Sequence, residues 1–185
     1  MQLFILRHGQ TEWNAEARYQ GHLNSPLTPL GRFQAFQQGE ILRSRGLDLP
    51  VFSSPLGRAR DTALIATAHL KRELTLEPNL REITMGEFDG MTKEEIVSAY
   101  PDFDPYVKGW TAEAYGGESH TEAYARARSV LDALQMSSIL VTHGVFSKYL
   151  RGTFLGLSHD ETIHLPQEQG CVYVLGPDGE EVWTL

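Results

Sequence analysis

Residues 2–14 read QLFILRHGQTEWN, and the apolar run 3–6 in this stretch ends directly at Arg7, His8 and Gly9. A short continuous apolar run is typical of a strand that is buried on both faces of a parallel sheet. In open α/β sheets, ligands bind outside the carboxyl ends of the strands. The stretch therefore predicts a buried strand whose tip presents a cation and an imidazole to a ligand.

Strand-like and helix-like segments alternate along the rest of the chain. Thr28-Pro29 supplies an N-cap followed by proline at the first helical position, which predicts a helix from there to about residue 45. Apolar spacing predicts further helices over 56–70, 123–134 and 145–155. Strands are expected over 51–54, 74–76, 137–142, 171–175 and 180–185, and the PDG turn at 177–179 predicts that the last two are antiparallel. This alternation predicts an α/β fold.

Composition limits the classes of protein. The chain has 185 residues, of which 41% are hydrophobic, which suffices for the core of one globular domain. The net charge is −8 and no run of lysine and arginine occurs, so nucleic acid and an anionic membrane surface are not expected partners. Cys171 is the single cysteine, so no internal disulfide forms. No signal peptide or membrane span is recognisable, and we expect a cytoplasmic protein.

A second histidine falls at a second strand tip. Thr142, His143 and Gly144 follow the predicted strand 137–142, so two histidines and Arg7 are expected at one edge of the sheet. An unprotonated imidazole can attack phosphorus covalently, and neighbouring arginines favour that form by lowering the histidine pKa. Arginine also holds phosphoryl oxygens in a fixed planar fork. The combination points to phosphoryl chemistry.

Six motifs in order carry a resemblance to a known family. They are LRHGQTEWN, YQGHLNSPLTPLGRFQA, SSPLGRARDTA, LREITMGEFDG, YGGES and LVTHG, and they span nearly the whole chain. The sequence resembles the histidine phosphatase superfamily, in the branch of cofactor-dependent phosphoglycerate mutases and their phosphatase relatives. The resemblance implies that His8 is the nucleophile that becomes phosphohistidine and that Arg7 and Arg58 bind phosphate. It also implies that His143 contacts the phosphoryl oxygens and that Glu82 is the general acid.

The resemblance implies further contacts around the phosphate. Glu87 is a rival to Glu82 as the acid, because both lie in LREITMGEFDG. His22 is a candidate for the rim of the pocket, although a solvated loop position is an equal alternative. The positions implied for phosphate or substrate contacts are Asn14, Gln20, Gly21 and Gly144.

The family contains enzymes of two kinds, and the middle of the chain bears on the choice. For the whole chain we expect a three-layer α/β/α sandwich with a mostly parallel central sheet. Residues 84–119 fit the α/β alternation least well, so we expect them to form a helical insertion over the active site that sets substrate specificity. Mutases of the family carry longer insertions, whereas this chain is compact here. The resemblance therefore implies a metal-independent phosphomonoester hydrolase that acts on a small phosphorylated metabolite, without a cofactor.

Two alternatives stay open at this point. One is a phosphoglycerate mutase, which would need 2,3-bisphosphoglycerate as cofactor. The other is a phosphate-binding regulatory protein without turnover, although the five residues that the resemblance assigns to catalysis are all present. A homodimer formed through an exposed strand edge is compatible with this fold, by analogy only.

Overall fold

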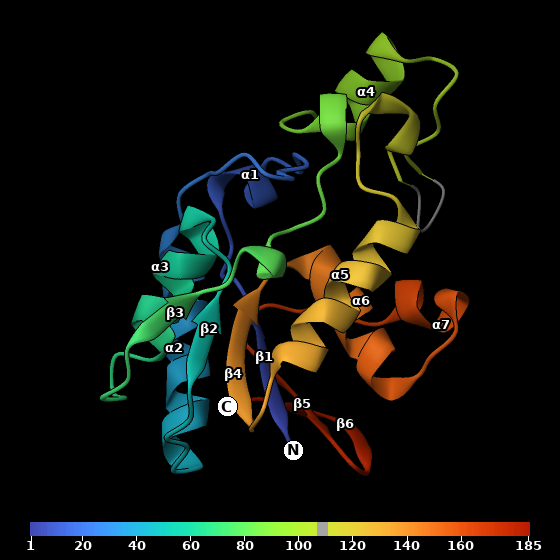
Figure 1. The fold of residues 1–185 in the computed structure, drawn as a ribbon. Coiled ribbons are helices and arrows are strands. Elements are labelled where there is room, and N and C mark those ends of the chain that lie inside the picture. Colours follow the sequence, from blue (N-terminus) through green and yellow to red (C-terminus); the bar gives the residue numbers. More distant parts are fainter. Residues whose placement is uncertain (107–110) are drawn as a thin grey trace.

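The computed structural model describes residues 1–106 and 111–185, which form a six-stranded sheet in the order β3-β2-β4-β1-β5-β6 (Figure 1). The four strands from β3 to β1 run parallel, and β5 is antiparallel to both of its neighbours. This confirms a mostly parallel sheet with an antiparallel end. The strands are β1 (Leu3–Arg7), β2 (Val51–Ser53), β3 (Leu74–Leu76), β4 (Ser138–Thr142), β5 (Val172–Gly176) and β6 (Gly179–Trp183).

Strands β1 and β4 lie in parallel register at the centre of the sheet. Arg7, the last residue of β1, is the partner of Thr142, the last residue of β4. The His8 N–H donates to the Thr142 carbonyl at 2.9 Å, which continues the pairing one residue beyond the strand. The two histidines that follow these strands therefore leave the sheet at the same edge, as the sequence predicts.

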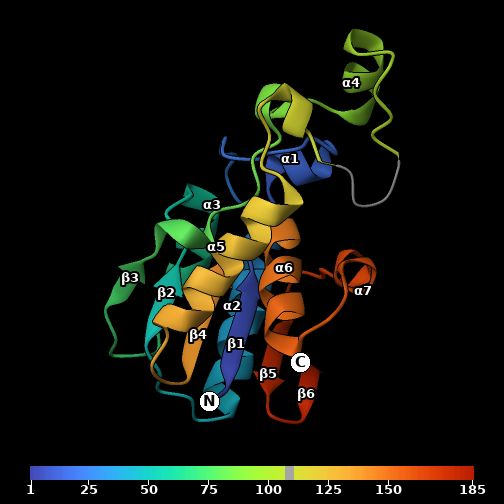
Figure 2. The same cartoon turned by 45° about the vertical axis from the view of Figure 1, so that its right-hand side comes forward.

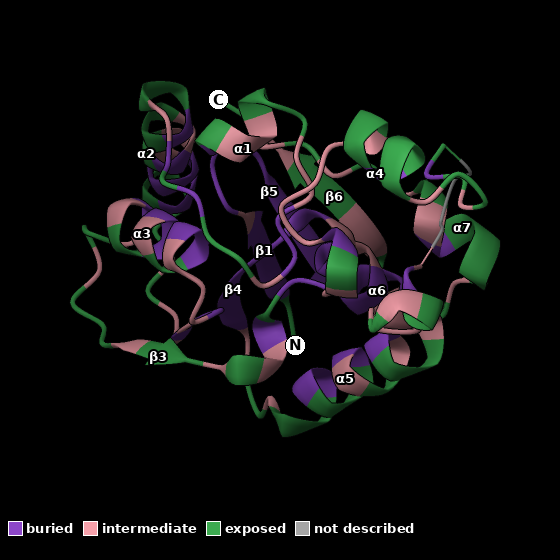
Figure 3. Ribbon diagram, turned by 90° about the horizontal axis from the view of Figure 1, so that it is seen from above, coloured by how far each residue is buried: buried purple, intermediate pink, exposed green. Residues whose placement is uncertain are grey.

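Helices cover both faces of the sheet and complete the predicted three layers (Figures 1 and 2). Helices α2 (Pro29–Ser44) and α3 (Gly57–Ala66) pack on Phe4 and Leu6, while α5 (His120–Ala133) and α6 (Gly144–Leu155) pack on Leu3 and Ile5. Alternate residues of β1 thus enter two separate apolar cores. Seen from above, the central strands β4, β1 and β5 are buried between the two helical layers, whereas the edge strands β3 and β6 are partly exposed (Figure 3).

The segment after β3 rises above the carboxyl edge of the sheet, where it meets the short helix α1 (Glu12–Ala15) (Figure 1). It contains the 3₁₀ turns η1 (Pro78–Leu80), η2 (Gly86–Phe88) and η3 (Glu113–Tyr115) and the helix α4 (Lys93–Ala99). Its aromatic side chains pack on one another, because the ring centroids of Phe88 and Tyr115 lie 4.7 Å apart and each lies between 4.8 and 5.6 Å from those of Tyr100 and Phe103. They form a small core of the insertion, whereas Trp110 lies outside the described residues.

The structure corrects the extent of one helix and adds two. The helix predicted over 56–70 ends at Ala66, because the Ala68 N–H donates three residues back to the Ile65 carbonyl, at 3.4 Å, and the chain then forms a turn. Helices α1 and α7 (His159–His164) are too short to give a readable apolar period. Along the described part of the chain, no helix combines the length and the apolar character that crossing a bilayer requires.

Candidate active site

His8 lies at the end of β1 with only 2% of its surface exposed. Its Nδ1 is 2.7 Å from the Gly9 carbonyl, which can only accept, so Nδ1 carries the proton. Nε2 then holds a lone pair, and it accepts a hydrogen bond from Arg58 Nε at 3.2 Å. The pKa of His8 lies well below its ordinary value, because burial and then the charges of Arg58 and Arg7 oppose protonation. His8 is therefore a neutral imidazole with an unprotonated Nε2.

Arg58 reaches His8 from the first turn of α3 and is 1% exposed. Two carbonyls fix its guanidinium, since NH1 donates to Leu23 at 2.6 Å and NH2 donates to Gly21 at 2.9 Å. Burial lowers the pKa of Arg58 to about 10, and the nearby carboxylates partly oppose that shift. The side chain stays charged at neutral pH and presents a fixed cation at His8 Nε2.

Arg7 supplies the second cation. Its NH1 donates to the Gln167 carbonyl, while its Nε is buried and has no hydrogen-bond partner within the described residues. Burial, the largest effect, lowers the pKa of Arg7. A Cβ added to Gly144 would lie 2.6 Å from Gln167 Oε1 and 3.0 Å from Arg7 Nε, so a larger residue at the start of α6 would displace these side chains. A buried donor without a partner is suited to a ligand oxygen.

His143 lies beside His8 in edge-to-face contact, with ring centroids 5.2 Å apart. Its Nε2 is 2.8 Å from Ser54 Oγ, and its buried Nδ1 has no partner among the residues that the structure describes. Burial, followed by the charge of Arg58, holds the pKa of His143 well below its ordinary value. Ser54, which follows β2, orients this ring and was not predicted as a site residue.

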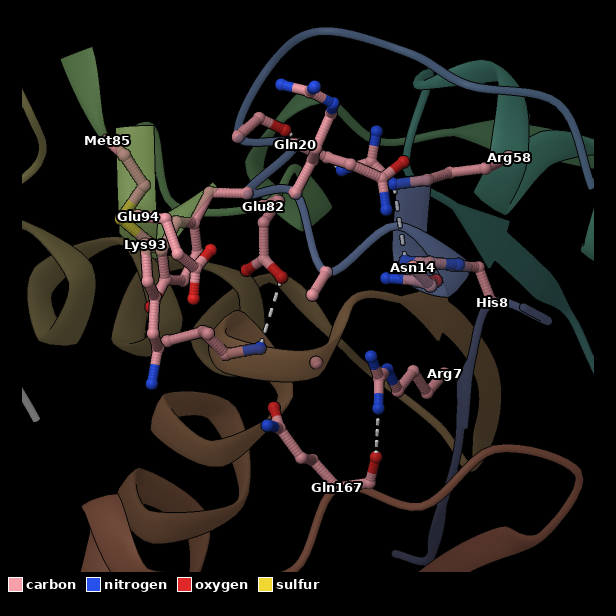
Figure 4. A pocket seen from close by; sticks show the side chains of 16 residues that line it. Arg7, His8, Asn14, Gln20, Arg58, Glu82, Met85, Lys93, Glu94 and Gln167 are labelled. Carbon is pink, nitrogen blue, oxygen red and sulfur yellow. Dashed lines mark hydrogen bonds between the residues drawn. The ribbon is translucent and has the colours of Figure 1, made fainter. Parts of the chain in front are cut away.

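Glu82 meets the N-terminus of α6 at the opposite wall. Its Oε1 accepts from the N–H groups of Phe146 at 2.8 Å and Ile83 at 2.9 Å, and its Oε2 accepts from that of Val145 at 3.1 Å. The carboxylate thereby satisfies backbone donors that the helix leaves open at its first turn. Glu82 has a positioned side chain rather than a mobile one, and it faces the same space as His8 (Figure 4).

Arg7, His8, Arg58 and Glu82 line a pocket of about 270 Å³ at the carboxyl edge of the sheet (Figure 4). His143 was also predicted for this site, but it is fully buried beside His8 and does not itself line the pocket. Predicted positions that line it are Arg7, His8, Asn14, Gln20, Gly21, Arg58, Glu82 and Gly144. His22 lines a neighbouring pocket instead, and its Nε2 is 2.9 Å from the Glu82 carbonyl. Glu87 does not line the active-site pocket and accepts a hydrogen bond from the Tyr100 hydroxyl at 2.8 Å.

Several lining residues were not predicted. Met85, Lys93 and Glu94 reach the pocket from the insertion, and Arg18 and Gln167 reach it from irregular segments. Met85 lies within the motif LREITMGEFDG, whereas the other four residues belong to no recognisable motif, so only the folded chain brings those four to the site. Among the described residues, no group of three or more histidine, cysteine, aspartate and glutamate side chains is arranged to hold a metal ion.

The two buried histidines predict an acid-sensitive fold. Because the pKa values of His8 and His143 are lowered in the folded state, the unfolded chain binds more protons once the pH falls below about 6.5. The free energy of unfolding should decrease from that pH downward, by up to about 1.4 kcal/mol per pH unit for each histidine, until the lowered pKa values are reached. Urea unfolding at pH 7.5, 6.5 and 5.5 measures this slope.

A variant with His8→Asn should show a shallower slope, because it retains only one of the two buried imidazoles. Equal stability of the natural chain at pH 7.5 and pH 5.5 would contradict the prediction.

Comparison with known proteins shows the family to which the chain belongs. The sequence profile of the histidine phosphatase superfamily (branch 1) matches residues 3–185. The chain is 36% identical over 176 residues to "Probable phosphoglycerate mutase GpmB" of Salmonella paratyphi B, covering 85% of this chain and 76% of that protein.

Solved structures show the same architecture. A mycobacterial glucosyl-3-phosphoglycerate phosphatase, solved with VO3, superimposes with a TM-score of 0.85 at 28% identity, covering 99% of this chain and 97% of the other. The alpha-ribazole phosphatase of Shigella flexneri shares the fold, with a TM-score of 0.82 at 22% identity over 100% of this chain and 96% of the other. By its sequence profile over nearly the whole chain and by this fold, the protein belongs to the histidine phosphatase superfamily, branch 1.

Proposed function

We propose that the protein is a phosphomonoester hydrolase that acts through a phosphohistidine at His8. The observation that carries the proposal is the state of His8, whose protonated Nδ1 faces the Gly9 carbonyl while Nε2 keeps its lone pair at the base of the pocket. An imidazole held in this tautomer is prepared for nucleophilic attack. Arg7 and Arg58 together carry two positive charges, which match the two negative charges of a phosphate monoester.

The reaction proceeds in two displacements at phosphorus. Substrate binds to the form of the enzyme in which Glu82 carries a proton. His8 Nε2 forms a bond to phosphorus while the bond to the ester oxygen breaks, and Glu82 gives that proton to the departing oxygen. Water then attacks phosphorus, the bond to Nε2 breaks, and Glu82 recovers a proton from the water. Arg7, Arg58 and His143 stabilise the phosphoryl oxygens in both steps, without a metal ion or an organic cofactor.

The size and lining of the pocket favour a small substrate. A volume of about 270 Å³ lies just below the range of roughly 300–1,000 Å³ that is typical of pockets for drug-sized ligands. Beyond the phosphate position, the wall carries both charged and apolar side chains, among them Lys93, Glu94 and Met85. We propose that residues 1–185 form one domain in which residues 84–119 are an insertion that sets substrate specificity. The substrate of the enzyme is then a small polar phosphorylated metabolite. The phosphatase activity named for the mycobacterial relative supports this class of substrate.

Phosphoglycerate mutase is the second candidate. The 36% identity to a probable phosphoglycerate mutase favours it. A mutase must return the phosphoryl group to substrate before water attacks, and it would need 2,3-bisphosphoglycerate to keep His8 phosphorylated. The compact insertion favours hydrolysis, because a short segment has few residues that could shield a phosphohistidine from water.

Release of inorganic phosphate in the presence of EDTA tests the proposal. The panel of phosphomonoesters includes 3-phosphoglycerate, p-nitrophenyl phosphate and small sugar phosphates, and each is assayed with and without added Mg²⁺. We expect turnover of at least one ester at a rate that EDTA does not change. Exchange between 3- and 2-phosphoglycerate that depends on 2,3-bisphosphoglycerate, without phosphate release, would identify the mutase instead. Neither activity would indicate a binding protein.

A further inference from the structure

Asp89 connects two segments that are far apart in the sequence. It follows η2, and its Oδ1 accepts from the Met85 N–H at 2.8 Å. Its Oδ2 accepts from the Thr84 hydroxyl and from the His22 N–H, both at 3.0 Å. One carboxylate therefore accepts from three donors, two of which belong to the insertion and one to the turn over 21–23.

The turn at Gly21 leaves no room between itself and this carboxylate. Gly21 has a φ of +48°, and a Cβ added there would lie 1.7 Å from Asp89 Oδ1. The opposite side of the same turn holds Arg58, because the Gly21 and Leu23 carbonyls accept from its two terminal nitrogens at 2.9 and 2.6 Å. The backbone over 21–23 thus lies between Asp89 and Arg58.

The guanidinium of Arg58 connects the turn over 21–23 to His8, so the position of the turn decides how Arg58 is oriented at His8. Its donors lie in one rigid plane, so the two carbonyls that fix the terminal nitrogens also fix Nε, which is 3.2 Å from His8 Nε2. A shift of the turn would rotate this plane relative to His8. The charge of Asp89 also acts on Arg58, since it raises an arginine pKa that burial lowers.

We propose that Asp89 is a positioning residue for the phosphate site, which holds the turn over 21–23 and through it orients Arg58 at His8. The inference rests on the proposed function only in taking Arg58 as a phosphate ligand. It assigns Asp89 no contact with substrate, and Asp89 does not line the active-site pocket.

Binding of inorganic phosphate, measured by titration calorimetry, tests the proposal without requiring turnover. The variant Asp89→Asn has one acceptor oxygen in place of two, so its amide group must face either the His22 or the Met85 N–H. We expect phosphate affinity to fall about tenfold. In an Arg58→Ala background the same substitution should change phosphate affinity less than about twofold, because a residue that acts through Arg58 has no effect once Arg58 is absent.

Glu95→Gln is the matched control. Glu95 joins the same two segments, by accepting from Arg18 at 2.6 and 3.0 Å, but it does not contact the turn at Gly21. We expect the control to bind phosphate within about twofold of the natural chain. An equal loss in both variants would mean that general attachment of the insertion matters, and would overturn the role of Asp89.

Two further outcomes separate this inference from the proposed function. Natural phosphate affinity in Asp89→Asn, or equal losses with and without Arg58, would overturn the inference even if the enzyme hydrolyses esters. A natural chain that binds phosphate but hydrolyses no ester, while Asp89→Asn binds phosphate about tenfold more weakly, would overturn the proposed function and support the inference.

Discussion

Replacing His8 with alanine should lower kcat for phosphate release by about 10⁴- to 10⁶-fold and abolish the phosphoenzyme at the same time. Alanine has no lone pair with which to attack phosphorus, and the arginines that remain bind phosphate without opening the covalent route. Rapid-quench experiments with radiolabelled substrate measure both quantities in one series. The label should appear in the natural enzyme as a phosphoramidate, which survives alkali and hydrolyses in acid.

A control histidine distinguishes loss of the nucleophile from loss of a titratable group in general. His164 lies at the end of α7, with 46% of its side chain exposed, outside the active-site pocket. The variant His164→Ala should retain natural turnover and phosphoenzyme formation. Label retained on protein in His8→Ala would place the covalent intermediate on another residue and contradict the assignment.

The position of His8 could be predicted because two simple patterns coincide. The apolar run 3–6 must be buried on both faces, and it ends abruptly at Arg7. Parallel strands that end together then bring His143 to the same edge, where the ring centroids are 5.2 Å apart. Local sequence decides the first feature, and the parallel pairing of β1 with β4 decides the second, so neither depends on how the loops pack.

The remaining parts of the site depend on contacts between loops. Asp89 gives no signal in the sequence that it meets Gly21, because the contact joins two irregular segments. Gln167 approaches Arg7 from the chain between α7 and β5, and its side-chain Oε1 is buried without a partner in the described part of the molecule. Lys93 reaches the pocket only through the fold of the insertion. Periodicity predicts elements well, but it does not predict how loops pack.

The second large effect is expected for Glu82→Gln, and its size should depend on the leaving group. Glutamine is nearly isosteric and keeps an oxygen for the N–H groups of Phe146 and Ile83, so only the hydrogen bond from Val145 is lost. It has no acidic proton to give to a departing alkoxide. Phosphorylation of His8 by an alkyl phosphate should slow by about 10²- to 10⁴-fold. With p-nitrophenyl phosphate, whose leaving group needs no proton, the loss should be about tenfold or less.

Single-turnover rates isolate this step, because Glu82 is also proposed to act on water in the second displacement. Glu87→Gln is the control, since Glu87 is exposed, accepts from the Tyr100 hydroxyl and lies outside the pocket. Its rates with both esters should stay within about twofold of the natural enzyme, as for surface substitutions in general. Equal losses with both esters in Glu82→Gln would reduce Glu82 to a structural cap of α6. A larger loss in Glu87→Gln that depends on the leaving group would transfer the role of the acid to Glu87.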